Sequence, residues 1–116
     1  MKTQEFSRLE RVAASIKRAL GQPLNNVARE LNIGLLTLTA VEVAPDLRRA
    51  TAFVSPLADD VDEAALLEGL NERAGELQRE MSSQLRMKRT PVLSFSIDRG
   101  IAQSARITQL LDPDSN

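Results

Sequence analysis

The residues of this chain that could do chemistry are mostly arginines and lysines, and the chemistry they suit is phosphate binding. Both side chains neutralise phosphate oxygens, and the guanidinium group of Arg donates two parallel hydrogen bonds. One group lies in and after a predicted helix and contains Arg73, Arg79, Arg86, Lys88 and Arg89. Arg79 and Arg86 are seven residues apart, so they share a face if the helix continues through both. A second group on the first predicted helix contains Arg8, Arg11 and Arg18.

Both groups also have a plainer explanation. A surface helix needs a polar face, and bases at its end suit the negative end of the helix dipole. Arg48 and Arg49 follow a predicted turn, where they could reach a phosphate or simply protect the edge of a sheet. Charge alone favours the plainer explanation for the larger group.

Residue types on which many enzymes depend are missing. The chain has no Cys, His, Tyr or Trp, which removes thiol nucleophiles, zinc thiolate sites and the usual acid–base group at neutral pH. The acidic stretch from Asp59 to Glu63 lacks the glycine and the distal glutamate of a calcium loop, and it suits the start of a helix. We therefore expect a protein that is not an enzyme and that has no cofactor and no metal site.

Charge is unevenly distributed along the chain, although the net charge is only −1. Residues 1–49 have a net charge of +3, residues 57–72 carry six acids and no base, and residues 73–106 have a net charge of +4. A phosphate group responds to the local field, so the overall charge does not exclude a nucleic-acid ligand. The acidic block offers an alternative binding face, suited to a protein partner.

Length and hydropathy indicate one domain in the cytoplasm. A chain of 116 residues can bury a single core, which we expect over residues 1–111, with 112–116 as a short polar tail. No segment approaches the roughly 20 apolar residues of a membrane span, and the first five residues lack the apolar core of a signal peptide. We expect no membrane contact, and a monomer, because every apolar stripe can be assigned to the core.

Three segments have the apolar spacing of helices. The first carries an apolar residue every three or four positions from Phe6 to Leu31, and Pro23 inside it predicts either one bent helix or two short ones. The second starts at the acidic stretch, with Val61 and Leu70 on its apolar face. The third carries Leu77, Met81 and Leu85, after a bend predicted at Gly75. We expect the third helix to close with Arg86, Lys88 and Arg89.

Strands are predicted over residues 35–43, 49–55 and 92–98. The first has two competing alternations, one through Leu36 and Leu38 and one through Val41 and Val43, and periodicity does not decide between them. In the third strand Leu93, Phe95 and Ile97 share one face. The order helix, strand, strand, helix, helix, strand predicts an α+β fold in which helices cover one face of a three-stranded sheet. This αββααβ order is that of type II KH-like domains.

The resemblance of this sequence to a known family lies in three segments. Residues 41–55, VEVAPDLRRATAFVS, look like the hairpin of the ribosome-binding factor A family, and residues 85–95, LRMKRTPVLSF, resemble its basic segment, proline and last strand. Arg11 and Val12, followed by Ile16 and Leu20, are similar to its opening helix. Gly75 matches the glycine at the family's bend between paired helices. The resemblance spans nearly the whole chain.

This resemblance implies a KH-like fold that binds the free small (30S) ribosomal subunit and its 16S ribosomal RNA during late maturation and 5′-end processing. Such proteins are associated with growth in the cold. The resemblance also favours phosphate contacts over a merely solvated face for the larger basic group. No Gly-x-x-Gly clamp is present, so binding would depend on phosphate contacts and shape. The alternative is a non-catalytic module that docks on ribosomal proteins through its acidic face.

Overall fold

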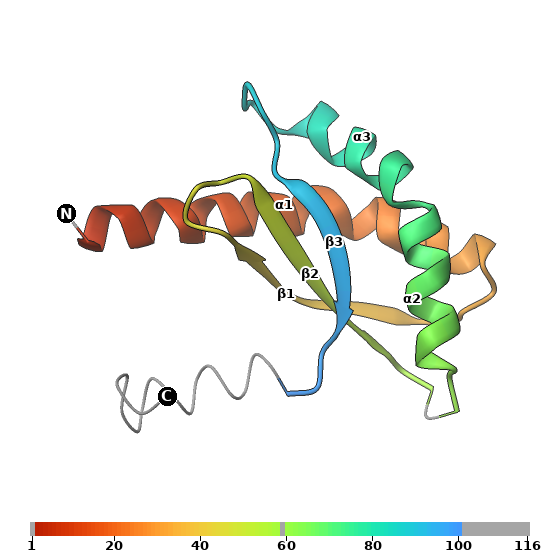
Figure 1. Ribbon diagram of the computed structural model, residues 1–116. Coiled ribbons are helices and arrows are strands. Elements are labelled where there is room, and N and C mark those ends of the chain that lie inside the picture. The colour runs from red at the N-terminus through yellow and green to blue at the C-terminus, as the bar shows by residue number, and fades with distance from the viewer. Residues whose placement is uncertain (1, 59, 101–116) are drawn as a thin grey trace.

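A computed structural model describes residues 2–58 and 60–100, with the side chains from residue 8 onward (Figure 1). The helices are α1 (Lys2–Glu30), α2 (Glu63–Glu72) and α3 (Ala74–Gln84), and the strands are β1 (Leu36–Val43), β2 (Arg49–Pro56) and β3 (Val92–Ile97). This is the predicted α+β fold with αββααβ order. The predicted polar tail, residues 112–116, and the last part of the predicted domain, residues 101–111, lie outside the described residues. Within the described part of the chain, none of the helices has the length and apolar character needed to cross a membrane.

The sheet has the order β1-β2-β3, with β1 antiparallel to β2 and β2 parallel to β3. Its covered face supplies alternate residues of β2 and β3 to the core, with Ala52, Val54 and Phe95 among them. The helices supply residues that are at most a few per cent exposed: Ile16, Leu20, Leu24, Val27, Leu66, Leu70, Leu77 and Met81. The three helices therefore share one core over one face of the sheet, as predicted.

A bulge in β1 resolves its two competing alternations. The register with β2 shifts between Leu38 and Ala40, so one extra residue is inserted at this point. Leu36 and Leu38 face the core before the bulge, and Val41 and Val43 pack against it afterwards. The bulge is fixed by Thr39, whose Oγ1 donates to the carbonyl of Phe53 at 3.2 Å. Each of the predicted sets is thus correct for half of the strand.

Pro23 lies inside α1 without ending it, so the prediction of one helix is confirmed and the alternative of two is not. Proline has no N–H, so the carbonyl of Ala19 loses its partner four residues on. The side chain of Gln84, at the end of α3, donates its Nε2 to this carbonyl at 3.2 Å. Ala19 and Pro23 are both buried, so water does not readily reach this carbonyl. The Gln84 side chain therefore supplies the hydrogen bond that the proline cannot make.

We expect Gln84→Ala to lower the free energy of unfolding by about 1–2 kcal/mol, because the Ala19 carbonyl then has no donor. In a Pro23→Ala background the same substitution should cost close to nothing, since the new alanine supplies its own N–H. Urea unfolding of the four proteins in this double-mutant cycle measures the coupling. Equal costs in both backgrounds would show that Gln84 does not compensate for the proline.

The bend between α2 and α3 is at Arg73, two residues before the predicted Gly75. Arg73 has φ −98° and ψ 6°, outside the helical region, and it ends α2 and begins α3. Its N–H donates to the carbonyl of Leu70 and its carbonyl accepts from Leu77, so backbone bonding continues across the bend. Gly75 lies in the first turn of α3, and an added Cβ there would meet nothing closer than 3.8 Å. The bend therefore does not need the glycine.

Candidate nucleic-acid interface

The predicted basic residues after Met81 are not on a helix. α3 ends at Gln84, and Leu85 is already extended with φ −99° and ψ 141°. Ser83 turns its hydroxyl back to the carbonyl of Glu80, a bond that competes with helix continuation. Arg86, Lys88 and Arg89 consequently lie in the connection from α3 to β3, and all three are exposed. The prediction that Arg79 and Arg86 share a helix face is wrong.

Gln78 holds this basic connection against α3. Its Nε2 donates to the carbonyl of Pro91 at 2.7 Å and to Thr90 Oγ1 at 3.2 Å, and its Oε1 accepts the N–H of Leu93 at 2.8 Å. The hydroxyls of Ser82 and Thr90 are 2.7 Å apart and add a second link. These bonds hold the second half of the connection, from Thr90 to Leu93, directly after the bases Lys88 and Arg89.

A groove brings the two predicted basic groups together. It lies between α1 and the end of α3, has a volume of about 540 Å³ and is lined by Ser15, Arg18, Ala19, Gln84, Leu85 and Arg86. Arg18 comes from α1 and Arg86 from the connection, and both are exposed. Arg11 is two helical turns before Arg18 and on the same side of α1, with Arg8 one turn earlier. The groove is thus the meeting point of charges that are distant in the sequence.

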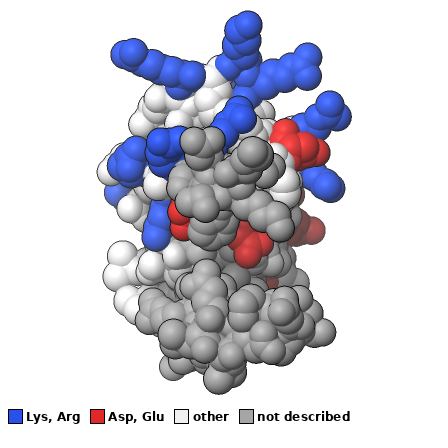
Figure 2. Space-filling model, turned by 90° about the vertical axis from the view of Figure 1, so that its left-hand side faces the viewer, with Lys and Arg blue, Asp and Glu red and all other residues white. Residues whose placement is uncertain are grey.

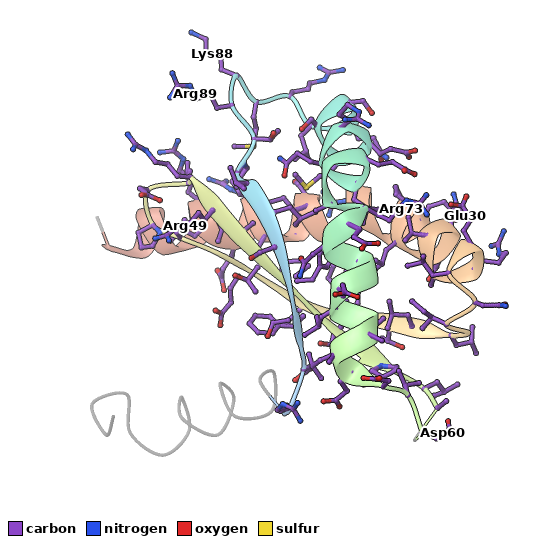
Figure 3. All side chains as sticks on the ribbon, turned by 45° about the vertical axis from the view of Figure 1, so that its right-hand side comes forward. Glu30, Arg49, Asp60, Arg73, Lys88 and Arg89 are labelled. Carbon is purple, nitrogen blue, oxygen red and sulfur yellow. The ribbon has the colours of Figure 1, made fainter. Side chains whose placement is uncertain are left out.

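Arg48 and Arg49, for which the sequence left phosphate contact and edge protection open, lie at the same end of the fold, where Arg49 lines a separate hollow with Glu42, Thr51 and Ser94. The N–H of Val92 donates to the carbonyl of Arg48 at 2.9 Å, and Arg49 pairs with Val92 in the parallel register of β2 and β3. The hairpin therefore lies beside the start of the strand that follows Lys88 and Arg89 (Figure 3). The signal that sequence reasoning lacked was this parallel pairing, which links residues more than 40 positions apart.

We call this surface the basic end and define it by eight exposed side chains: Arg8, Arg11, Arg18, Arg48, Arg49, Arg86, Lys88 and Arg89. Viewed from the N-terminal side of α1, Lys and Arg side chains gather over the upper part of the molecule (Figure 2). The exposed acids near these bases in the sequence are Glu10, Glu42 and Asp46, so bases are in clear excess at this end. Among the described residues, ion pairs are made by Arg73 and Arg99 and by none of these eight. The basic end therefore presents unneutralised positive charge, as a polyanion requires.

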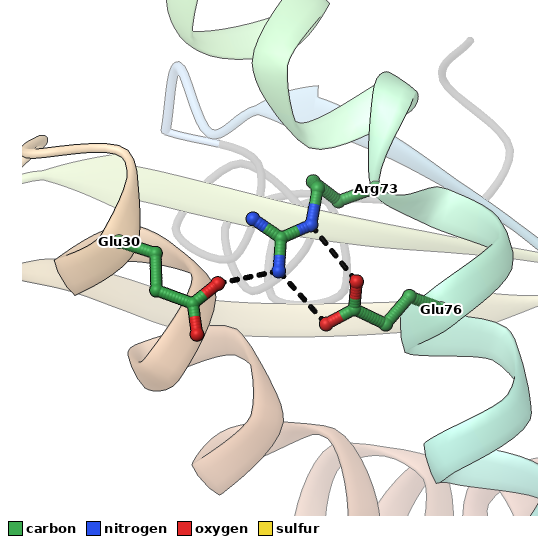
Figure 4. A network of polar contacts seen from close by, with 3 residues as sticks. All are labelled: Glu30, Arg73 and Glu76. Carbon is green, nitrogen blue, oxygen red and sulfur yellow. Dashed lines mark hydrogen bonds and ion pairs between the residues drawn. The ribbon is translucent and has the colours of Figure 1, made fainter.

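Arg73 and Arg79, the remaining predicted site residues, lie apart from the groove. The guanidinium of Arg73 is held by Glu30 of α1 and by both carboxylate oxygens of Glu76, at 3.0 and 2.8 Å (Figure 4). These hydrogen bonds raise the pKa of Arg73 and lower the pKa of Glu76. Arg79 is exposed on α3, where its charge also lowers the pKa of Glu76. Arg73 thus fastens the bend to α1, and its donors are directed to protein carboxylates.

The lowered pKa of Glu76 makes part of the stability depend on pH. The contribution of the Arg73 pair is complete above the ordinary carboxyl value of 4.5 and is lost as the pH falls through the lower native value. We expect Arg73→Met to lower the melting temperature at pH 7, and the difference from wild type to shrink below about pH 4.5. Melting curves across an acid series measure it. A difference that does not change with pH would mean that the arginine acts by packing alone.

Fold and surface together define the class: a small KH-like α+β domain without a Gly-x-x-Gly clamp, with a strongly basic surface that suits nucleic-acid phosphates. Residues 8–111 match the family model described as ribosome-binding factor A. Ribosome-binding factor A of Azoarcus sp. (strain BH72) is 32% identical over 109 residues, which cover 94% of this chain and 86% of that protein. The chain belongs to the ribosome-binding factor A family.

Solved structures agree with this assignment. The crystal structure of ribosome-binding factor A from Thermus thermophilus matches with a TM-score of 0.69 and 25% identity, over 78% of this chain and 97% of that one. A second match is a homology model of the Thermus thermophilus protein as fitted into the cryo-EM map of a 30S complex, with a TM-score of 0.56 and 27% identity. It covers 72% of this chain and 88% of that chain. The fold described above is thus the fold of the family.

Proposed function

We propose that this protein binds the free small ribosomal subunit by placing its basic end against the phosphates of 16S ribosomal RNA. The observation that carries the proposal is the groove in which Arg18 of α1 and Arg86 of the connection converge, with no protein carboxylate paired to either among the described residues. Phosphate contacts from such a surface supply most of the affinity of a protein that does not read sequence. The Thermus thermophilus relative fitted into a map of a 30S complex supports the same partner.

We further propose that the protein acts by occupancy and catalyses no reaction. It would hold a region of 16S ribosomal RNA in one conformation during late maturation and 5′-end processing, as a cytoplasmic monomer, and leave the finished subunit. Membership of the ribosome-binding factor A family supports this role. The conformational hold needs a rigid binding surface, and the links from Gln78 and Ser82 to the basic connection supply one.

The residues that we propose as RNA contacts are the eight of the basic end. Six of them were selected from the sequence, and Arg48 and Arg49 are added by the pairing of β2 with β3. Arg73 is omitted because its donors are occupied by Glu30 and Glu76. Arg79 is omitted because it lies on the surface of α3 between the carboxylates of Glu76 and Glu80.

The test is a salt titration of binding to a short single-stranded RNA, followed by fluorescence anisotropy. Each phosphate contact contributes about −0.7 to the slope of log affinity against log salt, so five to eight contacts predict a slope of about −3.5 to −5.6. A slope near zero would contradict binding through phosphates. Sedimentation of a tagged protein in cell lysate, at low and moderate salt, then asks whether it travels with free small subunits. Protein that stays at the top of the gradient at low salt would argue against ribosome binding.

A further inference from the structure

The part of the molecule away from the basic end carries an apolar groove. It lies where the turn after α1 meets the first half of α2, and its volume is about 340 Å³. The apolar part of its lining consists of Leu31, Ile33, Val61, Ala65, Leu66 and Gly69. Only Leu66 among the larger side chains is fully buried, while Leu31, Ile33 and Val61 are half-buried, so apolar carbon faces solvent here.

Gly69 keeps this groove open. A Cβ at position 69 would lie 3.1 Å from Cδ1 of Leu31, closer than ordinary van der Waals contact. With a larger residue at 69, Leu31 would have to move from its present place. A side chain at position 69 would thus crowd the groove wall at Leu31, and the size of the groove suits one or two aliphatic side chains of a ligand.

Two exposed leucines lie at the same end of the sheet. Leu35 precedes β1 and is 70% exposed, and Leu57 follows β2 and is 67% exposed. The N–H of Leu57 donates to the carbonyl of Leu35 at 3.1 Å, so the two residues are neighbours. Leu35 comes two residues after Ile33, and Leu57 comes shortly before Val61. Exposed apolar side chains next to an apolar groove are typical of a surface that contacts a protein.

The surroundings of the groove are mainly acidic, although the exposed Arg29 lines a neighbouring hollow with Asn32 and Leu35. Asp62 lines it, and Glu72 lies one helical turn beyond Gly69 on the same side of α2, with Glu68 on the flank. Asp60 is exposed on the loop that leads to α2 (Figure 3). Residues 57–72 contain no Lys or Arg, and the Arg99 guanidinium is held by Glu63. An RNA phosphate is repelled by such a surface, whereas a cationic ligand is attracted.

We propose that this groove docks a basic segment of another protein, in which an aliphatic side chain enters the groove and flanking Lys or Arg residues face the carboxylates. Charge complementarity selects this occupant, because an acidic segment is repelled and a neutral one gains nothing from the rim. The site is independent of the proposed RNA contacts. The two surfaces lie on different ends of the fold, so one molecule can bind RNA and a basic protein segment together.

Two adjacent alanines of α2 supply a matched pair of variants. Ala64 and Ala65 are both exposed, but only Ala65 lines the groove. Ala65→Arg places bulk and positive charge in the groove, and Ala64→Arg adds the same residue on another side of the helix. Both variants change the net charge equally. Circular dichroism establishes that each is folded before any binding is compared.

The probe is a synthetic peptide with two leucines between pairs of lysines, titrated into the ¹⁵N-labelled protein and followed by NMR. We expect shifts at groove residues, about tenfold weaker binding by Ala65→Arg and less than about twofold change by Ala64→Arg. A peptide with serines for the leucines should bind at least about fivefold more weakly, as should one with glutamates for the lysines.

Several results would overturn the proposal. Equal binding by the leucine and serine peptides would mean that the apolar groove is not used, and equal effects of the two arginine variants would place the peptide elsewhere. If Ala65→Arg does not fold, Glu68→Lys with Glu72→Lys takes its place, and unchanged affinity in that variant would also contradict the site. None of these outcomes bears on RNA binding, which the salt titration tests separately.

Discussion

Arg86→Glu combined with Arg89→Glu should weaken binding to 16S ribosomal RNA by about 100-fold. A hydrogen bond to a charged group contributes about 1.5–3 kcal/mol, so the loss of two such contacts exceeds the 2.7 kcal/mol that corresponds to this factor. Both side chains are exposed and outside any helix, so the fold should be unaffected. The measurement is anisotropy at fixed salt, with the salt slope expected to fall by about 1.4 for two lost contacts.

The control for this variant is Arg29→Glu combined with Arg79→Glu, which changes the net charge equally. Both of these arginines are exposed and lie on helices away from the basic groove. We expect a loss of less than about threefold, from long-range charge alone, because screened charges beyond roughly 8–10 Å contribute little. Equal losses in the two double variants would mean that total charge controls binding and that the basic end is not a localised interface.

Gln78→Met should be the most destabilising polar substitution among those considered, with a loss of about 2–4 kcal/mol in the free energy of unfolding. The side chain makes three hydrogen bonds to the segment from Thr90 to Leu93, and each contributes about 0.5–1.5 kcal/mol. Methionine has a similar volume, so packing is largely retained. Chemical denaturation measures the loss, and hydrogen exchange should show reduced protection of the Leu93 amide.

Gln22→Met is the matched control for the glutamine. Gln22 is exposed on α1, and within the described part of the chain its side chain bonds only to Asn26, one turn later in the same helix. We expect a change within about 0.5 kcal/mol, as for other surface substitutions. Gln78→Met should also weaken RNA binding in the folded state, because the bases of the connection lose their support. A variant that unfolds more easily but binds RNA normally would separate the two roles and contradict the second.

Much of the fold is predictable because local patterns and the core agree. Leu93, Phe95 and Ile97 alternate in the sequence and are buried in β3, and Asp62 caps α2 by accepting the N–H of Ala65, as the acidic stretch indicated. Periodicity failed where a single residue changes the phase, as Thr39 does in the bulge of β1. At Pro23 the helical periodicity held, but it could not show that the compensating donor comes from Gln84, 61 residues later in the sequence.

The candidate interface was predictable in composition but less so in geometry. The sequence indicates which bases are available, and charge spacing placed Arg11 and Arg18 on one face of a helix that does form. It could not indicate that α3 stops at Gln84, that Arg73 is occupied by two glutamates, or that the hairpin arginines join the connection. The Glu30–Arg73 pair and the position of the hairpin arginines depend on contacts between distant segments, which no local pattern encodes.

Among the described residues, the basic end and the acidic surroundings of the apolar groove separate positive from negative charge in a nearly neutral molecule. From Arg18 to Leu31 the helix advances thirteen residues, or about 20 Å at 1.5 Å per residue, which is more than two screening lengths at physiological salt. A phosphate surface close to the basic end therefore attracts its positive charge, while salt screens the acidic residues at the other end. This attraction turns the basic end toward the phosphates before contact. We therefore expect the basic end to face the RNA in more of the encounters than the net charge of −1 suggests. We also expect the association rate to fall with rising salt concentration, more steeply than for a protein whose charge of −1 is evenly spread.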